Sequence, residues 1–292
     1  MNIMRFRKLF FAISLFFLIP SLVSLISNGL NPSIDFVGGS RLELKIVNDT
    51  QINTSDINDS VSTIYNVDNV NFAGDDKYVI GGESIDNQKK QQAIDILASN
   101  YKEVSELKFE TVGAILSKEL LIKTLTALFL VAAIITIYVW RQFDELKYGV
   151  CAILAMLHDS IILLGAFSLL GYFYGVQVDV LFVTALLTTL SFSVHDTIVV
   201  YDRIRELKRK RRGVEYAQIV SMAVTETLSR SINNSVTIIL MLFALAILGG
   251  DSIRWFAVAL LIGVVSGTYS STFTAAPLLL LWDDISKKRK KR

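Results

Sequence analysis

The chain has 292 residues, of which 52% are hydrophobic and 19% are charged, and its formal net charge is +2. This composition is too apolar for an ordinary soluble domain, and the single cysteine, Cys151, excludes an intrachain disulfide. The sequence contains no zinc-ligand cluster, phosphate-binding glycine loop or nucleophile elbow. It therefore predicts neither an enzyme nor a bound cofactor or metal.

Six runs of about 20 apolar residues, each long enough for a hydrocarbon core of about 30 Å, recur along the chain. They cover residues 9–28, 121–140, 149–171, 180–200, 232–249 and 255–280. The first run exceeds the roughly 7–15-residue core of a signal peptide, so we interpret it as a retained helix. The sequence thus predicts a polytopic α-helical membrane protein with six transmembrane helices.

Lysines and arginines gather near alternate ends of these runs. They lie in four short segments that would share one side of the membrane: 5–8, 141–147, 203–212 and 287–292. The two short segments of the opposite side hold only Arg254. Because cytoplasmic loops carry the excess of positive charge, both termini are predicted to be cytoplasmic.

This topology predicts the domain boundaries. Residues 1–30 form the cytoplasmic N-terminus and first helix, and 31–118 form an extracytoplasmic domain. Residues 119–282 hold helices two to six, with a cytoplasmic loop at about 201–228, and 283–292 form a basic tail. Loop and tail are expected to lie on anionic lipid headgroups.

The outer domain shows alternating strand and helix patterns. Strands are predicted at 40–47, 69–73, 77–81 and 105–112, and helices at 54–65 and after a cap at Asn87. The order β-α-β-β-α-β is that of a ferredoxin-like α+β domain, here an interaction module. Between residues 31 and 119, fifteen acidic residues face eight lysines and arginines. That balance argues against nucleic acid as a partner.

A glycine pair follows the first span in the string Asp35-Phe36-Val37-Gly38-Gly39. Glycines adopt backbone angles that other residues avoid, so a tight turn into the first strand is the favoured interpretation. A hinge or docking loop is the functional alternative.

Ionisable groups inside the predicted spans are the main functional signal, because each costs roughly 2.5–3.5 kcal/mol at membrane depth. Asp196 and Arg230 carry opposite charge on consecutive helices and are predicted partners. Thr189 and Ser193 share the helix face of Asp196, and Arg230 shares its face with a second polar group. That group consists of Asn233, Asn234 and Thr237.

Each polar group has a structural alternative. Serine, threonine and asparagine side chains can simply bond between helices, and Gly263 and Gly267 can simply allow close packing. A permanent Asp196–Arg230 pair would be a poor stabiliser, so a carboxylate that takes up a proton is favoured. His158 and Asp159 either extend such a relay or fix helix packing.

The motifs together resemble the SecD/SecF family of bacterial protein-export membrane subunits. The resemblance rests on the glycine string at 35–39, on Leu157-His158-Asp159 and on the segment His195-Asp196-Thr197 to Glu206. Residues 227–230, the glycines at 249–250 and the segment 267–271 complete it. The match runs across nearly the whole chain in the family order.

The resemblance implies a subunit of the RND superfamily in the bacterial cytoplasmic membrane. Its partners would be a homologous six-span protein, SecD, the SecYEG channel and exported preproteins, with YajC as a further candidate. The pair would use proton or sodium flow to drive late steps of export. By motif position, Asp196 corresponds to the membrane carboxylate and Arg230 to the basic residue of the next helix.

One residue departs from the family pattern: His195 stands where related sequences often carry asparagine or serine. It points about 100° away from Asp196 on a helix and is a secondary candidate. Two other functions remain open, half of an RND-type small-molecule exporter and a non-conducting scaffold subunit of a translocase.

Overall fold

The computed structural model describes residues 3–48, 52–143, 145–211 and 213–290. The chain divides into a helical unit, Met1–Asn31 with Thr126–Arg292, and an α/β unit, Pro32–Leu125. Within the residues that the structure describes, six helices are long and apolar enough to cross a membrane, which agrees with the six predicted spans.

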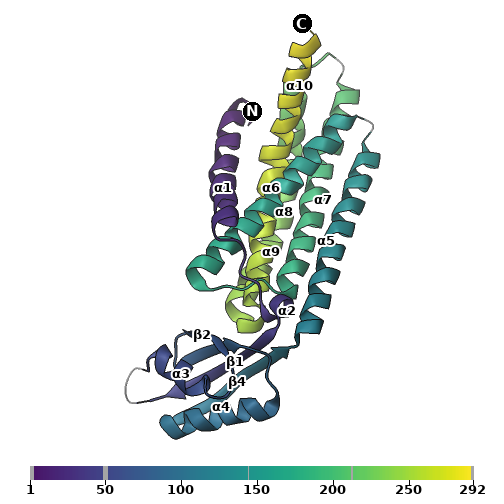
Figure 1. The fold of residues 1–292 in the computed structure, drawn as a ribbon. Coiled ribbons are helices and arrows are strands. Elements are labelled where there is room, and N and C mark those ends of the chain that lie inside the picture. The colour runs from purple at the N-terminus through teal and green to yellow at the C-terminus, as the bar shows by residue number, and fades with distance from the viewer. Residues whose placement is uncertain (1–2, 49–51, 144, 212, 291–292) are drawn as a thin grey trace. The chain divides into compact units, whose positions relative to one another are not determined.

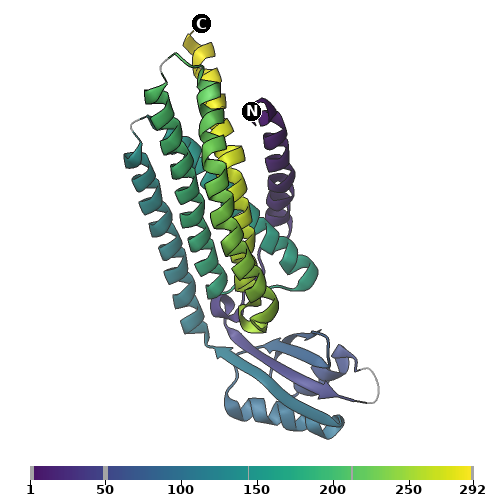
Figure 2. The ribbon, with the colours of Figure 1, turned by 180° about the vertical axis from the view of Figure 1, so that it is seen from behind.

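The spanning helices are longer than the apolar runs. Before the α/β unit lie the short η1 (Ile3–Phe6) and α1 (Arg7–Ser27). After it come α5 (Ala114–Gln142), α6 (Leu146–Tyr174), α7 (Val180–Lys210) and α8 (Tyr216–Leu248). The last span consists of α9 (Asp251–Ser270), a π-helical turn η2 (Ser271–Ala275) and α10 (Ala276–Lys290). Figures 1 and 2 show helices α6 to α10 running alongside one another.

The segment at 201–228, predicted to be a cytoplasmic loop, is mostly helical. α7 continues to Lys210, and α8 begins at Tyr216. Charged side chains support this extension, because Arg203 and Lys210 both bond Glu206 at helical spacing. An apolar run marks only the part of a helix that lies in hydrocarbon, so it underestimates the length.

Small residues bring α1 and α6 together in the helical unit. A Cβ at Gly165 would lie 2.2 Å from the Cβ of Ser21, so only glycine fits there. One turn further on, the hydroxyls of Ser24 and Ser168 are 2.8 Å apart and bond to each other. This is the close approach with interhelical hydrogen bonds that is typical of membrane helices.

The α/β unit contains one four-stranded antiparallel sheet with the strand order β2-β3-β1-β4. Its elements are α2 (Ile34–Val37), β1 (Gly39–Val47), α3 (Thr54–Val61), β2 (Val67–Phe72), β3 (Lys77–Gly82), α4 (Asn87–Asn100) and β4 (Glu103–Val112). Alternate residues of β1 are buried, including Leu42 and Leu44, and they form one core with residues of α3 and α4. The four strands and two longer helices follow the predicted order along the chain.

Two details of this unit differ from the prediction. α3 ends at Val61 and not at residue 65. The cap of α4 is Asp86, whose carboxylate accepts from Lys89 N at 2.9 Å, whereas Asn87 is the first helical residue. Both residue types cap helices well, so the sequence indicated the cap but not its position.

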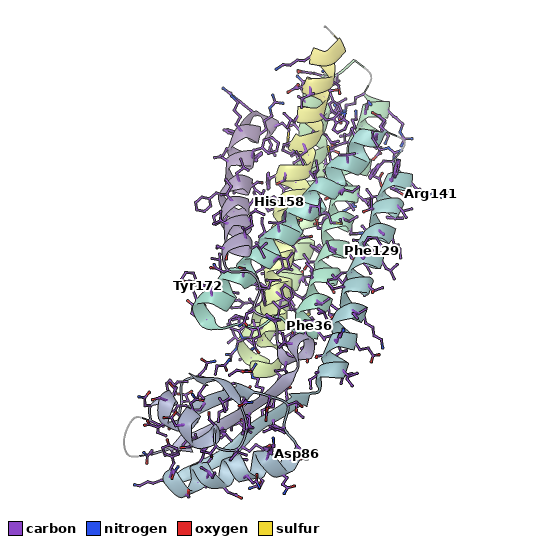
Figure 3. All side chains as sticks on the ribbon, viewed as in Figure 1. Phe36, Asp86, Phe129, Arg141, His158 and Tyr172 are labelled. Atoms are coloured by element: carbon purple, nitrogen blue, oxygen red, sulfur yellow. The ribbon has the colours of Figure 1, made fainter. Side chains whose placement is uncertain are left out.

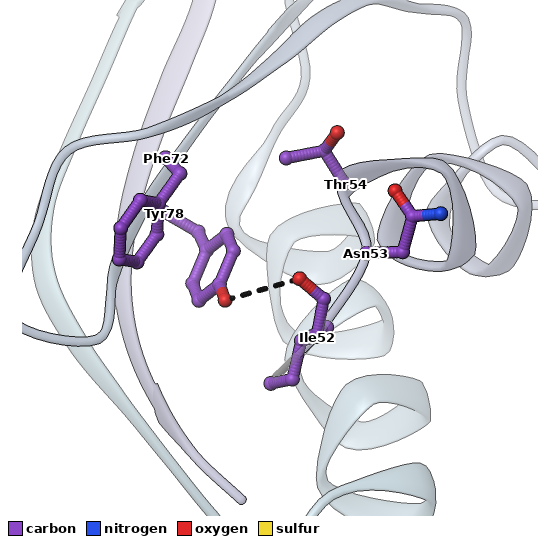
Figure 4. Close-up of a pocket in the computed structure, with 5 residues that line it drawn as sticks. All are labelled: Ile52, Asn53, Thr54, Phe72 and Tyr78. Atoms are coloured by element: carbon purple, nitrogen blue, oxygen red, sulfur yellow. Dashed lines mark hydrogen bonds between the residues drawn. The ribbon is translucent and has the colours of Figure 1, made fainter. Parts of the chain in front are cut away.

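A pocket of about 350 Å³ lies on the α/β unit beside β2 and α3. It is lined by Ile52, Asn53, Thr54, Phe72 and Tyr78 (Figure 4). The Tyr78 hydroxyl donates to the carbonyl oxygen of Ile52 at 3.4 Å across it. None of the five lining side chains is charged.

Candidate functional site

Asp159 on α6 is the most heavily bonded carboxylate in the helical unit, and its side chain is 1% exposed. Its Oδ1 accepts from His158 Nδ1 at 3.0 Å and from Ser266 Oγ at 2.7 Å. Its Oδ2 accepts from Ser193 Oγ at 2.6 Å and from Ser270 Oγ at 2.5 Å. Helices α6, α7 and α9 therefore meet at one carboxylate.

The glycine pair of the last span brings α9 to this position. A Cβ at Gly263 would lie 2.1 Å from Thr189 Oγ1, and one at Gly267 would lie 3.4 Å from the Ser193 Cα. The small residues let α9 approach α7 closely enough for its serines to reach Asp159. The predicted small-residue face is therefore an α7–α9 contact.

Asp196 lies one helical turn after Ser193, on the buried side of α7, and its side chain is 7% exposed. Its Oδ2 accepts one hydrogen bond, from Ser231 Oγ on α8 at 2.8 Å. This carboxylate therefore faces α8, whereas Ser193 faces α6 and α9. α7 thus carries one buried carboxylate, Asp196, and donates a hydrogen bond to a second one, Asp159.

The predicted ion pair between Asp196 and Arg230 is not formed in this structure. Arg230 is exposed, and no ion pair joins it to Asp196 among the described residues. The reason is helical geometry, because Ser231 occupies the contact and Arg230 lies about 100° around the helix from it. In this arrangement Ser231 contacts Asp196, and the Asp196–Arg230 pair stays a prediction.

Asn233 and Asn234 are also exposed, together with Arg230 and Thr237. The bond between α8 and α9 is instead made by Ser235, whose hydroxyl lies 2.6 Å from Thr268 Oγ1. The predicted polar face of α8 thus exists, but it points away from the described helices.

The remaining predicted residues occupy different positions. His158 lies buried next to Asp159, whereas His195 is exposed and turned away from the carboxylates, as its helical position predicted. Thr189 Oγ1 is buried beside Gly263 and has no hydrogen-bond partner in the described part of the chain.

The glycine string of the α/β unit forms a turn into β1. Ser33 caps α2 by accepting from Asp35 N at 3.2 Å, and Phe36 lies in the same helical turn. Gly38 and Gly39 then adopt φ values of +79° and +114°. A Cβ at Gly39 would also lie 2.6 Å from the carbonyl oxygen of Gly82, so the position requires glycine.

Sequence reasoning did not assign the serines of α8 and α9 that bond across the helices: Ser231 to Asp196, Ser235 to Thr268, and Ser266 and Ser270 to Asp159. Ser231 and Ser235 stand four residues apart on α8, and Ser266 and Ser270 stand four apart on α9. This spacing places each pair on one helix face and was a usable signal. Within the described residues, no three His, Cys, Asp or Glu side chains are grouped so that they could hold a metal ion.

Carboxylates buried between spanning helices define the class of this protein as a polytopic membrane transport protein. A family model described as "Protein export membrane protein SecD/SecF, C-terminal" matches residues 92–284, and one for the SecD/SecF GG motif matches residues 23–49. The chain therefore belongs to the SecD/SecF family of protein-export membrane proteins.

Individual relatives agree with this assignment. "Protein translocase subunit SecF" of Thermobaculum terrenum is 38% identical over 300 residues, which cover 97% of this chain and 94% of that protein. The SecF of Anaerolinea thermophila is 37% identical over 97% of this chain and 94% of its own. A crystal structure of SecDF from Thermus thermophilus, described as a translocon-associated membrane protein, superposes with a TM-score of 0.84 at 29% identity. It covers 97% of this chain, which spans 39% of that one.

Proposed function

We propose that this protein is the SecF-type subunit of the Sec translocase and couples proton or sodium flow to late steps of protein export. It acts with SecD beside the SecYEG channel, on preproteins that emerge at the outer side. The relatives that carry the name translocase subunit support the transport role. The observation that supports coupling is the arrangement around Asp196.

Asp196 is a buried carboxylate that accepts a single hydrogen bond from the neighbouring helix α8. Its one bond to Ser231 is of a kind worth about 0.6 kcal/mol on average between membrane helices. Arg230 stands next to Ser231 on the same helix, so a rotation of α8 by about 100° would exchange one for the other. In hydrocarbon, an isolated carboxylate favours its neutral form, and a nearby cation favours its charged form. Ion uptake at Asp196 would therefore select between two positions of α8.

The exposed polar face of α8 supports a protein partner in the membrane. Arg230, Asn233, Asn234 and Thr237 lie within a spanning helix, where contact with lipid would be costly. A second six-span unit can cover such a face. SecDF of Thermus thermophilus is 32% identical over 268 residues, and the matched region is 36% of that longer protein. We therefore place a SecD subunit against this face.

The α/β unit is proposed to be a ferredoxin-like module outside the cytoplasmic membrane, with both chain termini inside. Cysteines introduced at Ser84 and Ser286 should then be labelled from opposite faces of sealed vesicles. Labelling of both from the same face would contradict this topology. The native Cys151 is buried and provides the background control.

The coupling role is tested by Asp196→Asn and Arg230→Met. Asp196→Asn should insert and bind SecD, because the asparagine oxygen can still accept from Ser231. Arg230→Met should also insert, and co-purification measures its binding to SecD, because Arg230 lies on the face proposed for that subunit. Both should lose the stimulation of preprotein export by an ion gradient, and Asp196→Glu should retain part of it. Asp95→Asn, on α4 of the α/β unit, removes one carboxylate charge and should leave export unchanged.

This experiment also distinguishes the alternatives. Wild-type export by Asp196→Asn across a range of membrane potentials would favour a scaffold subunit. Efflux of small molecules by the chain alone, without SecD, would favour half of an RND-type exporter. Co-purification from native membranes tests the proposed partners SecD, SecYEG and YajC directly.

A further inference from the structure

Asp159 is enclosed by hydrogen-bonding side chains. It accepts four hydrogen bonds, from His158 Nδ1 and from the hydroxyls of Ser193, Ser266 and Ser270. Each carboxylate oxygen receives two of them. The carboxylate is therefore fixed in position beside His158.

His158 has one nitrogen that the structure leaves unused. Nδ1 is paired with Asp159 Oδ1 at 3.0 Å. Figure 3 labels His158 among the spanning helices. Its Nε2 is buried and has no hydrogen-bond partner in the described chain, and the side chain is 7% exposed. A buried polar atom without a partner costs about 1–3 kcal/mol, so this nitrogen requires an explanation.

The helices packed against α6 provide no cation that reaches Asp159 in the described residues. α1 carries Arg7 and Lys8 at its start only, and η2 has no titratable side chain. The other titratable groups at this depth are His195 and Asp196 on α7 and Tyr269 on α9, whose hydroxyl donates to Phe10 O. The charged side chains of α10 lie in its terminal part, from Asp283 onward.

We propose that His158 Nε2 is a proton-binding site, with Asp159 as its fixed counter-charge. Uptake of a proton forms one N–H bond at Nε2 and converts the imidazole to imidazolium. The net charge of the pair then changes from −1 to zero. A neutral pair is less costly than a lone charge in hydrocarbon, so the surroundings favour uptake. This site is distinct from Asp196, and the proposal does not depend on the proposed coupling function.

The site lies next to the most irregular stretch of the spanning helices. Ser270, which bonds Asp159, is the last residue of α9, and the π-helical turn η2 follows it directly. Tyr201 on α7 donates to the carbonyl of Ala275 in this turn at 2.9 Å. Such π-helical turns occur frequently at functional sites. The proton would therefore bind where α6, α7 and the last span are joined.

The test uses ¹⁵N-histidine NMR, which is selective because the chain has only two histidines. The full chain is labelled in nanodiscs with the exposed residue changed, His195→Gln, so that a single imidazole remains. Between about pH 5 and pH 9, the Nε2 resonance should move from imine-like to imidazolium-like values as the pH falls. The Nδ1 resonance should remain that of a protonated nitrogen throughout.

Asp159→Asn in the same background tests the counter-charge. It should move the midpoint of the titration to lower pH by about one unit or more, a tenfold loss of proton affinity. Ser266→Ala, which removes one donor and no charge, should move it by less than half of that. If His158 does not titrate in the His195→Gln protein, the proposal is wrong, and this result does not require Asp159→Asn to fold. A midpoint unaffected by Asp159→Asn in a folded protein would also overturn it.

Discussion

Asp159 and Asp196 are both buried carboxylates between the same spanning helices, yet they are held in opposite ways. Asp159 accepts four hydrogen bonds from α6, α7 and α9, whereas Asp196 accepts one, from Ser231. Asp159 bonds Ser193 of α7, which lies about one helical turn from Asp196 on the same helix. Because the two carboxylates are this close along α7, the difference does not come from depth in the membrane. It comes from the number of small polar side chains that the neighbouring helices present.

The difference separates structural from mobile charges. A carboxylate whose lone pairs are all used cannot change partner without losing several bonds at once. A carboxylate with one weak bond can exchange that bond for another at little cost. We therefore assign the change of partner to Asp196 and a fixed position to Asp159.

The largest expected effect is on stability and contrasts the two sites directly. Asp159→Ala leaves four donors without their acceptor and should lower the free energy of unfolding by about 2–4 kcal/mol. Asp196→Ala leaves one hydrogen-bond donor without its acceptor and should lower the free energy of unfolding by about 1 kcal/mol or less. Unfolding in mixed micelles, followed by far-UV circular dichroism, measures both. Equal losses would show that the number of bonds does not distinguish the two carboxylates.

A smaller loss is expected when α9 is pushed away from α7. Gly263→Ala places a methyl group against Thr189 and should destabilise by about 1–3 kcal/mol, as overpacking does. This change disturbs the α7–α9 contact that brings Ser266 and Ser270 to Asp159. It leaves the Asp196–Ser231 contact between α7 and α8 intact. Gly175→Ala, at a position with open space but φ of +66°, is a control for backbone strain alone. A smaller loss for Gly263→Ala than for this control would contradict the tight contact.

Ser231→Ala isolates the single bond of Asp196. It should lower the free energy of unfolding by about 0.6 kcal/mol, the average for hydrogen bonds between membrane helices. Ser191→Ala is the matched control on α7, because that hydroxyl is exposed and bonds only Leu187 O in its own helix. A loss at Ser231 above about 2 kcal/mol would mean that Asp196 is locked in place, as Asp159 is.

The sequence predicted the features that depend on one segment at a time. Apolar runs located all six spans, and alternating patterns located the strands of the α/β unit. The glycines at 263 and 267 predicted a close helix approach. Each of these signals is local, because it follows from the periodicity of one helix or strand.

The sequence did not predict which face of α8 meets α7. Arg230, the residue with the opposite charge, was the obvious partner for Asp196, but Ser231 makes the contact. Rotating a helix by one residue changes no local signal, since both residues suit a helix equally well. The choice depends on how several helices pack at once, for example on Ser235 meeting Thr268 four residues further along.

The last expected effect has the opposite sign and concerns a buried polar atom outside the membrane helices. The Tyr65 hydroxyl in the α/β unit is buried and has no hydrogen-bond partner among the described residues. It therefore resembles His158 Nε2 in burial, but it lies in a unit with its own hydrophobic core. Burial raises the pKa of Tyr65 from 10.0 to about 12.

Tyr65→Phe removes this atom and should leave stability at neutral pH unchanged or raise it by up to about 1 kcal/mol. In the wild type, the raised pKa means that the unfolded chain ionises first. The contribution of neutral Tyr65 is thus fully present below pH 10 and is lost as the pH rises from 10 through about 12. This alkaline loss should be weaker in Tyr65→Phe.

Urea unfolding of residues 33–112 expressed alone, a segment expected to fold cooperatively, measures both effects. Tyr78→Phe, which removes a hydroxyl bonded to Ile52 O, is the control and should bring no gain. If Tyr65→Phe destabilises more than this control, the Tyr65 hydroxyl has a partner that the described residues do not provide.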